Sequence, residues 1–137
     1  MRSVREGARH DLRRRTRALR AACVVAALGF GLGARAEDSA GEAQFKKSCG
    51  VCHTAEKGGE HRQGPNLFGV FGGPSAHAPG FAYSDALKNA KLKWDMPTLD
   101  RWIEDPQSVA EGAVMGYRQA DPDKRALIID YLTTLKD

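Results

Sequence analysis

The five residues Cys49-Gly50-Val51-Cys52-His53 constrain this chain more than any other feature of its sequence. Two cysteines three positions apart lie on one face of a helical turn, so both thiols can reach one flat partner. C-x-x-C-H is the attachment signature of c-type haem. Each thiol forms a thioether with one vinyl group, and the histidine that follows binds the iron. The motif therefore predicts one covalent haem c on Cys49 and Cys52, with His53 as an axial ligand.

Three other uses of these cysteines fit the sequence less well. A disulfide would suit an oxidising compartment, but it would leave the histidine that follows without a role. A redox-active C-x-x-C normally sits in a thioredoxin-like βαβ pattern, which is missing here. A zinc site needs further Cys or His ligands, and beyond the leader only His61 and His77 remain.

The first 36 residues differ in character from the rest of the chain. Nine arginines against two acids give them a charge of +7, whereas residues 37–137 carry −3, which together make the +4 of the whole chain. A basic start, an apolar run over residues 21–32 and the small residues around Arg35 are typical of a secretory signal peptide. We expect cleavage after Ala36, export to the periplasm and a folded domain over residues 37–137. The apolar run is shorter than the about 20 residues of a membrane span, so no stable membrane insertion is expected.

Two methionines beyond the leader are candidates for the second axial position of the iron, which must be filled or left open. Met96 stands in Trp94-Asp95-Met96-Pro97, just before a predicted helix, and we interpret it as core filler. Met115 stands between Gly112 and Gly116, in a loop between two helical patterns. A loop flanked by glycines can approach a porphyrin closely and offer a thioether to the iron. The sequence therefore favours Met115 as the ligand.

Helical signals recur along the chain, and no strand-like alternation stands out. Ser39 opens a capping box and a helix through Lys47, and Ser84 caps a helix to Ala90. Thr98 is predicted to cap a third helix that ends near Asp105, and Asp121-Pro122 begins a fourth. We therefore expect an all-α domain of four to five short helices wrapped around one covalent haem. A chain this small buries only a modest core by itself, and the haem would supply much of the rest.

Several longer phrases carry a resemblance to a known family. They are residues 49–59, residues 64–69, residues 78–86, Trp94, Asp105-Pro106, Gly112, Met115 and residues 125–132. Residues 41–135 thereby resemble class I cytochrome c of the short mitochondrial and alphaproteobacterial periplasmic type. The separation of His53 from Met115 agrees with the ligand spacing of that family without insertion.

The resemblance implies roles for further side chains around the haem. The Pro65 carbonyl would accept a hydrogen bond from the other ring nitrogen of His53. Tyr83 and Trp94 would donate hydrogen bonds to a haem propionate. Trp102 stands where the family usually has a tyrosine that hydrogen-bonds the methionine sulfur.

The resemblance also implies packing between the two ends of the domain. The N- and C-terminal helices would pack together, with Gly41 and Phe45 against Tyr131.

The function implied by the resemblance is that of a periplasmic single-electron carrier, monomeric and not an enzyme. Its partners would be redox proteins: a quinol-cytochrome c reductase, a terminal oxidase, a reaction centre or a periplasmic dehydrogenase. The acidic balance of residues 37–137 gives no support to nucleic-acid binding. The alternative is a haem peroxidase or gas-binding cytochrome with a labile methionine ligand. The ring of docking lysines typical of the family is thinned, because Ser48, Glu60, Gln107 and Val114 stand where lysines often occur.

Overall fold

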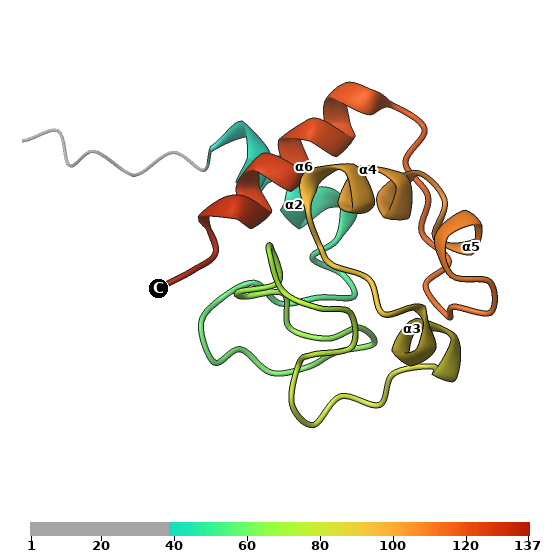
Figure 1. Cartoon of the computed structure of the whole chain (residues 1–137). Helices are drawn as coiled ribbons and strands as arrows, with labels where there is room; N and C mark the ends of the chain where they lie inside the picture. The colour runs from blue at the N-terminus through green and yellow to red at the C-terminus, as the bar shows by residue number, and fades with distance from the viewer. Residues whose placement is uncertain (1–38) are drawn as a thin grey trace, which may run out of the picture. The chain divides into compact units, whose positions relative to one another are not determined.

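The computed structural model describes residues 39–137. Five helices follow one another in this part of the chain (Figure 1): α2 (Ala40–Ser48), α3 (Asp85–Ala90), α4 (Met96–Glu104), α5 (Pro106–Val109) and α6 (Pro122–Thr134). Within it there is no strand, and one isolated β-bridge joins Pro74 to Lys93. The predicted all-α fold is confirmed. The predicted signal peptide and its cleavage site after Ala36 lie outside the described residues.

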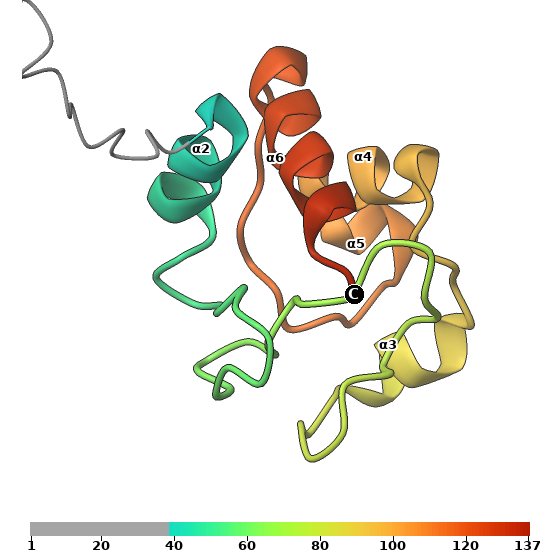
Figure 2. The same cartoon turned by 90° about the vertical axis from the view of Figure 1, so that its left-hand side faces the viewer.

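The first and last described helices pack against each other, as predicted. α2 lies beside α6 in two perpendicular views (Figures 1 and 2). The Phe45 and Tyr131 rings are 5.2 Å apart between centroids. A Cβ added to Gly41 would lie 2.6 Å from the carbonyl oxygen of Leu127 and 3.0 Å from Cβ of Tyr131. Only glycine therefore lets the two helices approach this closely.

Three of the four predicted helix starts are confirmed by their capping side chains. The Ser39 hydroxyl accepts a hydrogen bond from the Glu42 amide at the start of α2, and the Ser84 hydroxyl does so at the start of α3. The Asp121 carboxylate accepts from two amides of the first turn of α6. Each cap satisfies amides that have no partner inside their own helix.

The predicted start of α4 was wrong by three residues. Asp95, rather than Thr98, is the N-cap, and its carboxylate accepts from the Thr98 amide at 2.9 Å. Pro97 falls in the first turn, where its missing N–H costs no helical hydrogen bond. Met96 is thus the first residue of α4 and is 50% exposed, so the interpretation of Met96 as core filler was also wrong.

The helix α5 was not predicted, because four residues are too few for a periodic pattern. Asp105 ends α4 and caps α5, and its carboxylate accepts from the amide of Gln107 at 3.1 Å. Pro106 opens α5 and is almost fully buried. None of the helices in residues 39–137 is long and apolar enough to span a bilayer.

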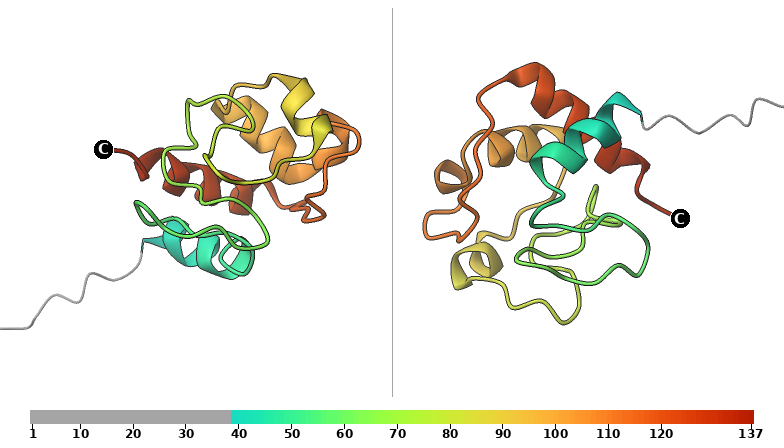
Figure 3. Two further views of the ribbon diagram at one scale, coloured as in Figure 1. Left: turned by 90° about the horizontal axis from the view of Figure 1, so that it is seen from below. Right: turned by 180° about the vertical axis from the view of Figure 1, so that it is seen from behind.

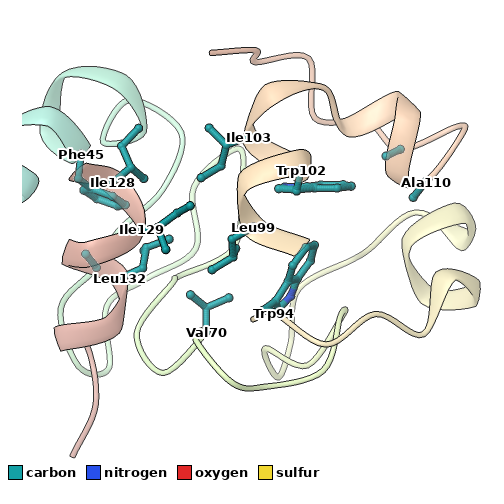
Figure 4. Packing of buried hydrophobic residues seen from close by; sticks show 12 residues of the cluster. Phe45, Val70, Trp94, Leu99, Trp102, Ile103, Ala110, Ile128, Ile129 and Leu132 are labelled. Carbon is teal, nitrogen blue, oxygen red and sulfur yellow. The ribbon is translucent and has the colours of Figure 1, made fainter. Parts of the chain in front are cut away.

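Half of the buried apolar side chains in the described residues come from α4 and α6 (Figure 4). α4 provides Leu99, Trp102 and Ile103, and α6 provides Ile128, Ile129 and Leu132. The segment 49–84 carries no helix and runs along one side of the helices (Figures 1 and 3). It faces the apolar sides of α4 and α6 across a cavity.

Candidate functional site

A cavity of about 320 Å³ lies between the segment 49–84, the helices α4 and α6, and the loop 113–117. Its lining includes all eight predicted site residues: Cys49, Cys52, His53, Pro65, Tyr83, Trp94, Trp102 and Met115. Among the described residues that line it, none is Arg, Lys, Asp or Glu. The cavity wall is thus mainly apolar, with only a few polar atoms.

The two cysteines enter the cavity from the tight turn that ends α2. The amides of Cys52 and His53 both donate to the carbonyl oxygen of Cys49, at 3.0 and 2.9 Å. Both thiols are free and half-buried, and Cys52 Sγ donates to Oε1 of Gln63 at 3.3 Å. Burial, with Cys52 nearby, raises the pKa of Cys49 to about 12.

The raised pKa of Cys49 argues against a redox-active pair of cysteines. Redox-active cysteines react as thiolates, which a lowered pKa provides. The described part of the chain also holds no group of three or more Cys, His, Asp or Glu that could bind a metal ion by themselves. A thioether carries no charge, so its burial here avoids the desolvation cost that burial of a thiolate would carry.

His53 is held in one orientation and in one tautomer. Its Nδ1 lies 2.7 Å from the carbonyl oxygen of Pro65, and a carbonyl can only accept, so Nδ1 carries the proton. Burial lowers the pKa of His53, although the bond to Pro65 acts in the opposite direction. The imidazole is therefore neutral near pH 7 and its Nε2 lone pair is free, as a metal ligand requires.

Gly64 packs directly on the His53 ring. A Cβ added there would lie 2.6 Å from Nδ1 of the imidazole, closer than real Cβ atoms come to a neighbour. The Gly64 amide also donates to the carbonyl oxygen of Cys52 at 2.8 Å. Glycine at this position is thus required by the close approach of the backbone to the ring.

Met115 reaches the cavity from the loop between α5 and α6. Its side chain is half-buried, whereas the preceding Val114 is 81% exposed. The thioether sulfur is the one soft, uncharged ligand besides the thiols on the cavity wall. The cavity therefore presents an imidazole and a thioether, two uncharged groups of the kind that can bind a haem iron.

Aromatic side chains close the cavity on the side of α4. Trp94 and Trp102 are buried and meet edge to face at 5.2 Å between ring centroids. Tyr83 Oη accepts from the amide of Ala78 at 3.2 Å, which leaves the hydroxyl proton able to donate. Burial raises the pKa of Tyr83, so the group is a neutral donor near pH 7.

One buried side-chain nitrogen in the described residues lacks a hydrogen-bond partner, and it belongs to a residue of the same cavity. It is Nδ1 of His77, next to Ala78 in the chain. An unpaired buried nitrogen is costly, and a haem carboxylate lying near His77 and Tyr83 would supply an acceptor. With two thiols, one imidazole, one thioether and apolar walls, the residues present fit a haem.

His77 was not predicted from the sequence to belong to this site. It stands in a loop rich in Gly and Pro, where no periodicity indicates which side chain turns inward. The eight predicted site residues were found because the haem motif, the loop around Met115 or the family resemblance marked them.

Comparisons with known proteins agree with this geometry. The family model "Cytochrome c" matches residues 39–136. Cytochrome c of Chlamydomonas reinhardtii is 46% identical over 93 residues, which cover 67% of this chain and 83% of that protein. Cytochrome c-550 of Novispirillum itersonii is 42% identical over 110 residues (72% and 99%), and cytochrome c2 of Rhodopila globiformis is 44% identical over 97 residues (70% and 91%).

Proteins of this family are electron carriers that hold haem c covalently through cysteines, and the described part of this chain has two, Cys49 and Cys52. The match covers the whole helical domain and every residue that lines the cavity. This chain belongs to the class I cytochromes of the cytochrome c family.

Proposed function

We propose that this protein is an exported single-electron carrier in which Nε2 of His53 and Sδ of Met115 are the axial ligands of the haem iron. One observation carries the proposal. A single uncharged cavity gathers both thiols, a neutral imidazole with a free Nε2, and the one thioether of the loop 113–117. With both axial positions filled, the metal has no site for a substrate, as expected of an electron carrier rather than an enzyme.

The bound haem supplies an iron that gains and loses one electron. Around it, the Pro65 carbonyl holds the proton on Nδ1 of His53 and so keeps Nε2 directed at the metal position. A thioether from Met115 favours the ferrous state and raises the reduction potential. Tyr83 and Trp94 would donate hydrogen bonds to a haem carboxylate, and Trp102 would donate to the sulfur of Met115.

Proton NMR of the ferrous holoprotein tests the ligand pair. A methionine held over a porphyrin has its methyl signal shifted far upfield by the ring current. We expect one such methyl signal, absent from Met115→Ala and kept in Met96→Ala, whose side chain is 50% exposed on α4. A shifted methyl that survives in Met115→Ala would contradict the assignment.

The compartment follows from residues 1–36, which we propose are a signal peptide removed after Ala36. The domain would then be residues 37–137 in the periplasm. Two of the similar proteins, cytochrome c-550 and cytochrome c2, are bacterial. The mass and the N-terminal sequence of holoprotein from a periplasmic extract test this, since cleavage elsewhere or a retained leader would contradict it.

The partners we propose are redox proteins that dock briefly at the cavity mouth: a quinol-cytochrome c reductase, a terminal oxidase, a reaction centre or a periplasmic dehydrogenase. Val51, between the two cysteines, is 79% exposed, and Val114, on the cavity wall, is 81% exposed. Ser48 and Gln63 add uncharged polar groups to the same lining. We infer that docking depends on small apolar contacts more than on paired charges.

A further inference from the structure

Gln107, in the four-residue helix α5, makes two hydrogen bonds to the loop that carries Met115. Its Nε2 donates to the carbonyl oxygen of Ala113 at 2.6 Å. Its Oε1 accepts from the amide of Gly112 at 3.1 Å. One side-chain amide thus binds the backbone at positions two and three residues ahead of the Met115 thioether.

We call these two hydrogen bonds of Gln107 the clamp. They matter because the backbone of the loop makes few hydrogen bonds of its own. The Ala113 amide closes a turn onto the carbonyl oxygen of Ala110 at 3.0 Å. The next backbone–backbone bond in the described chain comes from the amide of Gln119, which donates to Ile103 at 2.9 Å. The residues 114–118 between these points make none. The position of Met115 therefore depends on how firmly the two ends of this stretch are held.

The downstream end is held by a buried arginine. Nη1 of Arg125, on α6, donates to the carbonyl oxygens of Gln119 and Ala120 at 3.0 and 2.9 Å. Its Nε donates to Asp100 on α4 at 2.7 Å. The upstream end has Gln107 in the equivalent place, and near the downstream end Nη2 of Arg118 also lies 3.0 Å from Oδ1 of Asp105.

The backbone around Gly112 adds a reason why the upstream end needs support. Gly112 has φ +88°, a conformation that L side chains rarely adopt. Its amide has Oε1 of Gln107 as its acceptor. Without that acceptor the turn 110–113 would keep one backbone bond, from Ala113 to Ala110.

We infer that Gln107 is a positioning residue for Met115, an inference that rests on the proposed role of Met115 as an axial ligand. The chemistry of the clamp requires an amide, since it must donate and accept at once. A glutamate at this position could still accept from Gly112 but could not donate to Ala113, and a methionine could do neither.

Imidazole binding to the ferric holoprotein tests the inference, because added imidazole competes with Met115 for the iron. Its apparent affinity rises in proportion to the fraction of molecules in which the loop is open. We expect Gln107→Met to bind imidazole roughly tenfold more tightly than the natural protein, equivalent to about 1.4 kcal/mol. Gln107→Glu should fall between the two.

Ser108→Ala is the matched control on the same short helix. The Ser108 hydroxyl donates to the carbonyl oxygen of Asp105 at 2.8 Å, so its loss perturbs α5 without touching the loop. We expect its imidazole affinity to match that of the natural protein. An equal rise in Ser108→Ala and Gln107→Met would show a general loosening of α5 and would overturn the inference.

Met115→Ala separates failure of this inference from failure of the ligand assignment. If Met115→Ala binds imidazole no more tightly than the natural protein, Met115 is not the ligand. Both the ligand assignment and the inference about Gln107 are then wrong. If Met115→Ala binds tightly but Gln107→Met and Gln107→Glu behave as the natural protein, only the clamp is wrong. Amide hydrogen exchange gives a second readout: Gly112 should exchange faster in Gln107→Met, while Gln119 keeps its rate.

Discussion

The carbonyl oxygen of Pro65 and Nδ1 of His53 lie 2.7 Å apart, so the backbone next to Gly64 fixes both the proton and the plane of the imidazole. The segment 61–68 thereby becomes part of the metal site although it contributes no ligand. Burial lowers the pKa of the same ring and keeps it neutral, while the bond to Pro65 places the single proton on Nδ1 and leaves Nε2 free. The geometry around His53 therefore depends on Gly64 as well as on Pro65.

Gly64→Ala tests how closely that segment must approach the ring. The added Cβ would lie 2.6 Å from Nδ1 of His53, so the ring or the loop must move. We expect the free energy of unfolding of the holoprotein to fall by about 1–3 kcal/mol, as for other over-packed sites. Guanidinium denaturation measures it. Gly73→Ala is the control, because Gly73 does not line the cavity and its added Cβ would come no nearer than 3.3 Å to a neighbour; equal losses in the two variants would contradict the close approach.

Cys49→Ser and Cys52→Ser should each lower the yield of haem-containing protein sharply, since one of the two thioether bonds is lost in each. The haem content per polypeptide, measured after denaturation in acid and solvent, reports covalent attachment directly. Ser48→Ala changes a neighbouring residue of the same lining and should keep the natural yield. Normal covalent haem in both cysteine variants would show that attachment occurs elsewhere.

Asp95→Ala should destabilise α4, whose first turn uses the Asp95 carboxylate as its cap. The side-chain bond to Thr98 holds the pKa of Asp95 below its usual value. A carboxyl group with a lowered pKa stabilises the fold above its unfolded-state pKa, and that contribution is lost as the pH falls through the folded-state pKa. Asp95→Asn should therefore lose less stability than the natural protein between neutral and acid pH. Denaturation midpoints across this range measure it, and an unchanged pH dependence would count against Asp95 as the cap.

Electron transfer to a redox partner should depend only weakly on ionic strength, because Val114 on the cavity wall and Val51 between the two cysteines are both exposed and uncharged. Val114→Lys should steepen the salt dependence of the bimolecular rate with a redox partner whose docking face is acidic. Met96→Lys adds the same charge at an exposed position on α4 and serves as control. A steep salt dependence in the natural protein would contradict apolar docking.

Much of this fold could be predicted from local signals in the sequence. The caps Ser39, Ser84 and Asp121 are short-range features, in which one side chain bonds an amide two or three residues later, and they marked helix starts correctly. The start of α4 was misplaced because Asp95 and Thr98 are both good caps, and the sequence alone does not rank them. The helix α5 has too few residues to show the spacing of apolar residues that predicts a helix.

The candidate site was predictable where chemistry fixes the spacing, as in Cys49, Cys52 and His53. His77 and Gln107 were not, for a physical reason. Their roles come from three-dimensional contacts: His77 turns toward a cavity built by distant segments, and Gln107 bonds a backbone five and six residues further on. Patterns among neighbouring residues in the sequence do not predict such contacts.

The visible spectrum of the ferrous holoprotein with and without carbon monoxide tests the central claim most directly. With His53 and Met115 both bound, a c-type spectrum should stay unchanged when the gas is added, because no axial position is open. A spectrum that shifts on adding carbon monoxide to the natural protein would show an open or labile position. That result would contradict the electron-carrier account and favour a peroxidase or a gas-binding cytochrome.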